Sequence, residues 1–127
     1  MKVPRADVKL RQAADMLAEV ISSAGHEPFL ATDEIAGRGL TNPQDFMPFV
    51  REHIQTADLV ILLHHPELRG GLIEAGIAYA QTIPIWLCHR PGEHVSSSMR
   101  GCADETFEYK RLDDLQKKLS SRLNDGF

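Results

Sequence analysis

Two short, continuously apolar segments constrain the fold of this chain more than any other feature. Residues 58–63 read Asp-Leu-Val-Ile-Leu-Leu, and residues 84–88 read Pro-Ile-Trp-Leu-Cys. Neither segment alternates between apolar and polar side chains, which is typical of strands that are covered on both faces in a parallel sheet. Residues 71–81 lie between them and are rich in small side chains. This pattern predicts a strand–helix–strand unit, because parallel strands need a crossover connection.

The flanking segments extend this unit. Apolar residues at helical spacing predict three further helices, at residues 6–24, 42–56 and 112–124. Short apolar runs predict two further strands, at residues 27–31 and 106–109. The order of these elements predicts an α/β fold with three layers and a mostly parallel sheet, similar to flavodoxin-like and Rossmann-like folds.

The beginning of the chain departs from this pattern. Only Met1-Lys2-Val3 precedes Pro4, and proline cannot donate a hydrogen bond to a sheet ladder. We therefore expect the usual first strand to be missing or vestigial. The length of 127 residues fits one domain, which we expect to span residues 1–127.

Charge and composition argue against several classes of partner. The net charge is -4 and no run of Lys or Arg occurs, so a nucleic-acid partner is not expected. No apolar stretch approaches the ~20 residues that span a bilayer, and the N-terminus lacks the apolar core of a signal peptide. We expect a cytoplasmic protein without a membrane partner. The two cysteines, Cys88 and Cys102, form no CxxC pair, which argues against structural zinc, and we expect neither a metal nor a cofactor.

Glu74 is the first candidate for a chemical role. Ligands of parallel sheets bind at the carboxyl ends of the strands, where the loops 32–42, 64–71 and 89–101 lie. The sequence predicts Glu74 in the first turn of the helix at 71–81, where the helix dipole favours an anion. An ionised carboxylate at this edge suits attack on an anomeric carbon. The alternative is that glutamate is simply a favoured residue in a first helical turn.

Other polar residues lie in the same loops. Ser97, Ser98 and Arg100 form a candidate phosphate site, because hydroxyls and a guanidinium suit phosphate oxygens; the alternative is a polar loop without a ligand. Gly70 and Gly71 would let backbone amides approach a ligand, or they belong to an ordinary turn.

Histidines and aromatic residues also offer candidates for the site. His64 ends the strand at the ligand edge, where it would line a base pocket or donate a proton. Its neighbour His65 points to the opposite face of a strand, which argues against a metal site. His89 is interpreted as a solvated loop residue, and Tyr79 and Trp86 are interpreted as core residues.

Two motifs carry a resemblance to a known family. The run Glu74-Ala75-Gly76-Ile77-Ala78-Tyr79-Ala80 follows an apolar strand and a glycine-containing loop. It resembles the Glu-(Leu/Ile/Ala)-Gly-x-Ala-x-Ala motif of the nucleoside 2-deoxyribosyltransferase superfamily. The run from Arg90 to Asp104 looks like the Ser-x-Met-x-Arg-Gly-x-Ala-Asp run of one branch, the 2′-deoxynucleoside 5′-monophosphate N-glycosidases.

The resemblance implies roles for individual residues. It implies that Glu74 is the catalytic nucleophile and that Ser97, or Ser98 in the alternative register, contacts a 5′-phosphate, often from the neighbouring subunit. It also implies a homodimer or a higher oligomer. One position departs from the family pattern: the usual catalytic Asp, eight positions before Asp58, is Val50 here. Asp45 or Glu52 would replace it only if the helix were rotated or shifted.

The sequence thus supports a ranked set of functions. The first is an enzyme that hydrolyses or transfers at the N-glycosidic bond of a nucleoside or nucleoside 5′-monophosphate, with this small molecule as its partner. The second is a TIR-like domain that hydrolyses NAD or signals by self-association, since its catalytic Glu also follows a buried strand. The third is a nucleotide-binding protein that has lost catalysis, which Val50 motivates.

Overall fold

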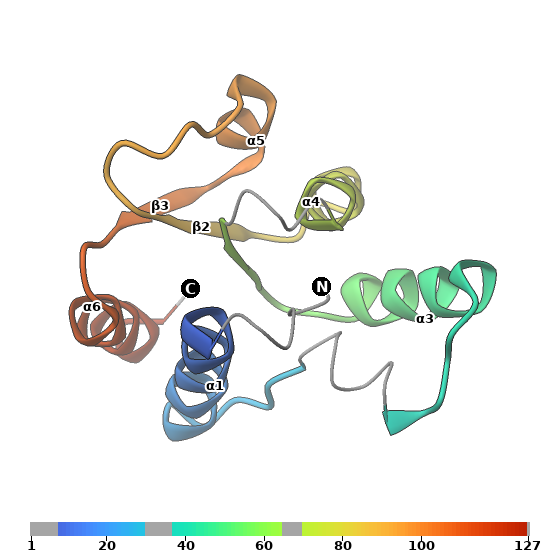
Figure 1. The fold of residues 1–127 in the computed structure, drawn as a ribbon, viewed down its shortest axis with the longest axis horizontal. Helices are drawn as coiled ribbons and strands as arrows, with labels where there is room; N and C mark the ends of the chain where they lie inside the picture. The colour runs from blue at the N-terminus through green and yellow to red at the C-terminus, as the bar shows by residue number, and fades with distance from the viewer. Residues whose placement is uncertain (1–7, 30–36, 65–69, 127) are drawn as a thin grey trace.

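The computed structural model describes residues 8–29, 37–64 and 70–126 of the chain. In these ranges five α-helices and three β-strands follow one another (Figure 1). In chain order they are α1 (Val8–Ser23), α3 (Pro43–Gln55), β1 (Val60–Leu63), α4 (Gly70–Ala80), β2 (Ile85–His89), α5 (Ser97–Cys102), β3 (Glu105–Glu108) and α6 (Leu112–Asn124). The predicted helix at 112–124 and the strand–helix–strand unit are confirmed.

The three strands form one parallel sheet in the order β1-β2-β3. Val60 pairs with Ile85 across β1 and β2, and Trp86 pairs with Glu105 across β2 and β3. Helices α1 and α6 cover one face of the sheet, and α3, α4 and α5 cover the other (Figure 1). The predicted three-layer α/β fold with a parallel sheet is therefore confirmed.

Each face of the sheet has its own apolar core. Under α1 and α6 the buried members are Ala13, Leu17, Val20, Leu63, Trp86, Cys88, Tyr109, Leu115, Leu119 and Leu123. Under α3, α4 and α5 they are Val50, Ile54, Leu62, Ala75, Ala78, Ile85, Leu87, Val95 and Met99. All five residues of β2 are buried, as expected for a central strand with a helical layer on both faces.

Local signals place the helix ends where the sequence predicts them. α1 stops before Gly25, whose φ of 87° suits a glycine, and the N–H of His26 donates to the carbonyl of Ile21 at 3.1 Å. Asn42 caps α3 by accepting from the N–H of Gln44 at 2.9 Å, with proline at the first helical position.

The predicted strand at 27–31 is wrong for its described part, since residues 27–29 lie outside the sheet. Phe29 packs on α3 instead, where its ring stacks on His53 with 4.0 Å between the ring centroids and lies 5.8 Å from the ring of Phe49. Residues 30 and 31 lie outside the described residues, as does most of the predicted loop 32–42. An apolar run becomes a strand only where a neighbouring strand is within reach, and the sequence does not show this.

The predicted loop at 89–101 is only partly a loop. It contains most of α5, which begins after Ser96. The hydroxyl of Ser96 accepts from the N–H of Met99 at 3.2 Å, and Met99 is buried in the core. This capping interaction and the apolar anchor explain why a serine-rich segment forms a helix here.

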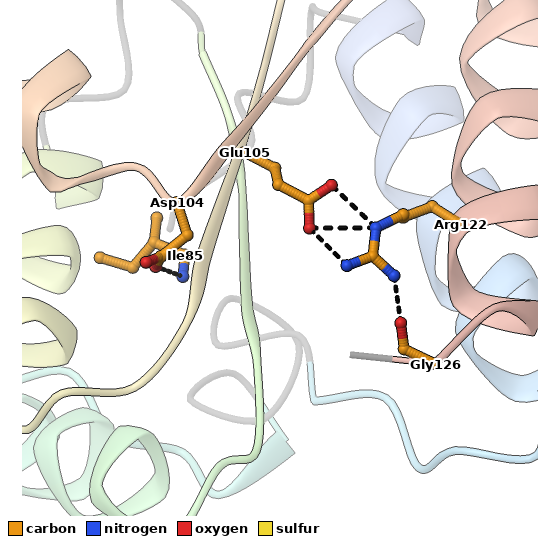
Figure 2. Close-up of polar contacts among 5 residues, drawn as sticks. All are labelled: Ile85, Asp104, Glu105, Arg122 and Gly126. Atoms are coloured by element: carbon orange, nitrogen blue, oxygen red, sulfur yellow. Dashed lines mark hydrogen bonds and ion pairs between the residues drawn. The ribbon is translucent and has the colours of Figure 1, made fainter.

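Polar contacts tie β3 and α6 to the rest of the sheet (Figure 2). Arg122 of α6 holds Glu105 of β3 with two nitrogens, at 2.8 and 2.7 Å, and its guanidinium lies 5.1 Å from the centroid of the Trp86 ring. Arg122 also donates to the carbonyl of Gly126. Asp104 accepts from the N–H of Ile85 at 2.8 Å. These contacts are structural, and they fix the edge of the sheet that β3 forms.

Candidate active site

Glu74 lies on α4, directly after the loop that follows β1. The helix begins at Gly70, so Glu74 is its fifth residue and its first turn holds no acidic side chain. The predicted first-turn position of Glu74 is therefore wrong by one residue. The helix dipole stabilises a carboxylate at this position less, because its effect falls off within the first turn. The side chain of Glu74 is half-buried.

The helical spacing of α4 shows which way Glu74 faces. Ala75 and Ala78 are buried against the sheet. Glu74 precedes Ala78 by four residues and Ile77 by three, so it lies on the same side of the helix as both. Ile77 borders α3. Glu74 therefore lies at the margin of the core on the side of α4 that faces α3.

A hollow of about 610 Å³ lies between α3 and α4 on this side. We call it the α3–α4 hollow; its lining residues are Pro43, Gln44, Met47, Pro48, Arg51 and Ile77. Gln44 and Arg51 supply its hydrogen-bond donors, and the other residues supply an apolar wall. Small-molecule sites combine an apolar surface with a few polar groups in this way. Sequence reasoning missed Gln44 and Arg51, because an exposed polar residue on a helix carries no signal of its own.

The serine-rich segment holds three serines with different environments. Ser96 is occupied as the cap of α5, whereas Ser97 and Ser98 are exposed. Arg100 is also exposed, and its Nε donates to the carbonyl of Val95 at 3.2 Å. Ser97 and Ser98 are thus accessible to a ligand. The Nε of Arg100 contacts the carbonyl of Val95, and this hydrogen bond does not use the two terminal nitrogens of its guanidinium.

Within one chain, α4 separates this segment from Glu74. α4 lies between α3 and α5, and α5 packs on it through Met99, in the cluster that holds Ala75 and Ala78 (Figure 1). Glu74 faces α3, so Ser97 and Ser98 belong to the opposite side of α4. The structure therefore does not bring Glu74 and these serines together on one side of the helix.

The outer surface of α4 is apolar. Leu72, Ile73 and Tyr79 are exposed to 54, 56 and 60%. The prediction that Tyr79 is a core residue is wrong, because the buried stripe of α4 consists of alanines and Tyr79 points away from it. Trp86, in contrast, is 1% exposed and lies in the core as predicted. We call Leu72, Ile73 and Tyr79 the apolar stripe.

Val50 occupies the position where the resembled family has its catalytic Asp. It is 3% exposed and packs in the core with Leu62 and Ala78. Asp45 and Glu52 are exposed on α3. α3 is not rotated to bring either carboxylate to the place of Val50, so that place holds no proton donor.

The remaining candidates divide between the edge of the sheet and the core. His64 follows β1, is half-buried, and its N–H donates to the carbonyl of Cys88 at 2.8 Å. At Gly71 a Cβ would meet nothing within 4 Å, so the described part of the fold does not itself require glycine there. Gly70 opens α4. His65 lies outside the described residues.

His89 and Cys88 end β2 inside the protein. The interpretation of His89 as a solvated loop residue is wrong: it is 8% exposed, and its Nδ1 donates to the carbonyl of Arg90 at 2.9 Å. Burial raises the pKa of the Cys88 thiol to about 12. Cys88 is therefore a protonated core residue and not a nucleophile.

Two absences hold for the described residues. No three or more His, Cys, Asp or Glu side chains among them gather in an arrangement that would hold a metal ion. In the same part of the chain, no helix combines the length and the apolar character needed to cross a membrane.

Comparison with solved structures identifies the fold. The structure is similar to the CMP N-glycosidase BcmB of Clostridium botulinum, with a TM-score of 0.75 and 20% identity over 90% of this chain and 91% of that one. It is also similar to a 2-deoxyribosyltransferase of Bacillus psychrosaccharolyticus, with a TM-score of 0.68 and 18% identity over 94% and 90% of the two chains.

The chain has the fold that the CMP N-glycosidase and the 2-deoxyribosyltransferase share. The resemblance indicated by the two sequence motifs is thus confirmed in the fold. No family model and no curated protein matches the sequence. The similar structures are enzymes that act on nucleosides or nucleotides.

Proposed function

We propose that this protein hydrolyses or transfers at the N-glycosidic bond of a nucleoside or nucleoside 5′-monophosphate, with Glu74 as the nucleophile. One observation carries the proposal. Glu74, the only carboxylate of α4, is half-buried three residues before Ile77, which lines the α3–α4 hollow, in a chain that has the fold of two enzymes acting on such molecules.

The proposed reaction has two steps. A carboxylate oxygen of Glu74 forms a bond to C1′ of the sugar while the bond from C1′ to the base nitrogen breaks, and the electron pair leaves with the base. The base takes a proton from water. Water, or a second base in a transfer reaction, then attacks C1′ and releases the carboxylate. These steps use only a carboxylate and solvent, with no cofactor.

Substrate contacts follow from the accessible polar groups. Ser97, Ser98 and Arg100 hold the 5′-phosphate through hydroxyls and a guanidinium. His64, Gly70 and Gly71, around the loop between β1 and α4, contact the sugar or the base. The exposure of Ser97 and Ser98, together with the separate capping role of Ser96, supports this division of roles.

The phosphate group and Glu74 meet in a homodimer. Two observations support this assembly: α4 separates Glu74 from its own serine segment, and the apolar stripe is exposed. A second chain packed on the stripe would cover Leu72, Ile73 and Tyr79 and bring its own serines toward Glu74. Analytical ultracentrifugation tests this arrangement: Ile73→Asp is expected to shift the protein to monomer, and Ile73→Val is not.

The test of catalysis is base release. Wild-type protein is incubated with a panel of ribo- and deoxyribonucleoside 5′-monophosphates and the free base is measured by chromatography. We expect release from at least one member, and a loss of about 10³-fold or more in Glu74→Gln, because a nucleophile acts in the rate-determining bond changes. Glu52→Gln, an exposed carboxamide on α3, is the matched control and should retain activity. Equal release by Glu74→Gln would refute the role of Glu74.

Val50 favours a second candidate function, a nucleotide-binding protein without turnover. Its burial leaves no carboxyl to protonate the departing base at the family's usual position. Thermal stabilisation by nucleoside monophosphates with no base release would support this candidate. Base release above that of Glu74→Gln would exclude it.

A further inference from the structure

The central strand β2 ends on a buried histidine. β2 runs from Ile85 to His89, and His89 is 8% exposed. The carboxyl ends of parallel strands form the edge of the sheet at which ligands bind. A buried polar atom at this edge needs a hydrogen-bond partner, because leaving it unsatisfied is costly. The partners of the two ring nitrogens therefore show whether His89 is purely structural or is available to a ligand.

The register of the sheet shows to which face the side chain of His89 points. Leu63 pairs with Cys88, and both are buried in the core under α1 and α6. The next residues, His64 and His89, continue this register, since the N–H of His64 donates to the carbonyl of Cys88 at 2.8 Å. Successive side chains of a strand point to opposite faces. His89 therefore lies on the face that α3, α4 and α5 cover, and α4 is the helix that carries Glu74 (Figure 1).

One ring nitrogen of His89 has a partner and the other does not. Nδ1 lies 2.9 Å from the carbonyl oxygen of Arg90. A carbonyl oxygen only accepts hydrogen bonds, so Nδ1 carries the proton and Nε2 of the neutral ring keeps a lone pair. In the described part of the chain no hydrogen bond reaches Nε2. A bond from one ring nitrogen to a backbone carbonyl fixes the tautomer and the ring orientation of histidines that use the other nitrogen for function.

We propose that Nε2 of His89 accepts a hydrogen bond from an N–H or O–H donor of the substrate and selects substrates by that donor. This role rests on the function proposed above, which supplies a nucleoside or nucleoside 5′-monophosphate. Such a molecule carries two kinds of donor, the hydroxyls of the sugar and the amino group of the base. A carbonyl in the same place would face the lone pair of Nε2 and leave it unsatisfied, so a substrate without the donor is rejected.

Nitrogen NMR of protein labelled with ¹⁵N-histidine observes this hydrogen bond directly. The spectra are recorded at pH 8, where an ordinary histidine ring is neutral, and the His89 signals are assigned by their loss in His89→Asn. The free protein should show a protonated Nδ1 and a bare Nε2. A saturating nucleoside 5′-monophosphate should shift the resonance of Nε2 and leave that of Nδ1 nearly unchanged.

The outcomes of this measurement separate the role of His89 from the proposed function. A protonated Nε2, or an Nε2 that is already hydrogen-bonded in the free protein, overturns the role, because the chain or a water molecule then supplies the partner. A nucleotide that binds and loses its base while the Nε2 signal stays unchanged overturns the role and leaves the proposed function standing. Binding of no nucleotide, together with no base release, refutes both.

Two substitutions distinguish the two ring nitrogens. The amide of an asparagine side chain reaches only the place of Nδ1, whereas that of glutamine reaches the place of Nε2. His89→Asn thus removes the proposed acceptor, and His89→Gln replaces it by an amide oxygen. Base release is measured with substrates that differ in one donor. These are CMP, its 2′-deoxy and 3′-deoxy forms, and UMP, which has a carbonyl in place of the amino group, with AMP and IMP as the purine pair.

In the wild type, removal of one of these donors should lower kcat/KM by about 10- to 100-fold, the usual effect of leaving a buried acceptor unsatisfied. The removal that has this effect identifies the donor as a sugar hydroxyl or as the amino group of the base. In His89→Asn the same removal should change kcat/KM by less than about threefold, while His89→Gln should keep most of the wild-type difference. His94→Asn, an exposed histidine in the loop after β2, is the matched control and should behave as wild type.

Equal discrimination by His89→Asn and the wild type refutes the role of Nε2. Base release by the wild type that is insensitive to every donor removal refutes it as well. If His89→Asn does not fold, the NMR signals are assigned through His89→Gln, and the shift of Nε2 in wild-type protein decides the question.

Discussion

Replacing Val50 by aspartate tests whether the side chain at this position of α3 points into the apolar core. Val50 is 3% exposed and belongs to the core under α3 and α4. Aspartate of similar size would lose about 2 kcal/mol of apolar burial and would place a carboxyl there at a further cost of about 2–3 kcal/mol. We therefore expect Val50→Asp to lower the free energy of unfolding by about 4–5 kcal/mol.

This loss has a clear thermal signature. Unfolding entropy is about 2.1 cal/mol/K per residue, which for 127 residues is about 0.27 kcal/mol/K. Differential scanning calorimetry should show a Tm about 15 °C lower for Val50→Asp. Val50→Ala, which removes apolar contact without adding a polar group, should lower the Tm by only about 7 °C, for a loss of about 2 kcal/mol.

The pH dependence of the stability of Val50→Asp shows whether burial of the carboxyl causes the loss. Burial favours the neutral acid, so the pKa of the introduced carboxyl in the folded state lies above its unfolded value of ~3.9. The variant therefore gains stability relative to wild type as the pH falls through that raised pKa, and loses it as the pH rises. A Val50→Asp variant that is as stable as Val50→Ala at neutral pH would refute the inward orientation of Val50. It would also reopen the possibility that α3 presents a carboxylate to the site.

Three further predictions concern single side chains. Arg122→Ala should lower the urea concentration at the midpoint of unfolding, since it removes an ion pair, whose side chains are each about a third exposed, and a ring contact. An unchanged midpoint would mean that these contacts do not stabilise α6. Ser96→Ala should lower the free energy of unfolding by about 1 kcal/mol through loss of the α5 cap. Ser97→Ala should lower it by less than about 0.5 kcal/mol. Equal losses would contradict the distinction between the capping serine and the accessible serine. Iodoacetamide at pH 8 should label Cys102 and not Cys88, whose pKa of about 12 keeps the thiol protonated; rapid labelling of Cys88 in the folded protein, seen by peptide mass spectrometry, would contradict its burial.

The part of the fold that sequence predicts well is the part specified by local pattern. β1, β2 and α4 follow from two apolar runs and a helix of small residues, and α6 follows from leucines at helical spacing. The segment at 27–29 has the composition of a strand but packs its phenylalanine on α3. Composition alone does not tell whether a neighbouring strand is available.

The candidate site shows the same division. Motifs single out Glu74, which lies three residues before Ile77 on α4. Ile77 lines a hollow whose polar residues, Gln44 and Arg51, have no sequence signal. The serine-rich run looks uniform in sequence, yet one hydroxyl caps a helix and two are exposed. That α4 lies between Glu74 and these serines is a property of tertiary packing, which no spacing along the chain reveals.

The central claim is that Glu74 forms a covalent bond to the sugar. A nucleoside 5′-monophosphate with fluorine at C2′ in the arabino configuration should trap this state, because fluorine slows the loss of the sugar from the carboxylate. Intact-mass spectrometry should then show one sugar phosphate added per chain, and peptide mapping should place it on Glu74. Base release from the panel without any adduct on Glu74, or an adduct that persists in Glu74→Gln, would contradict the account.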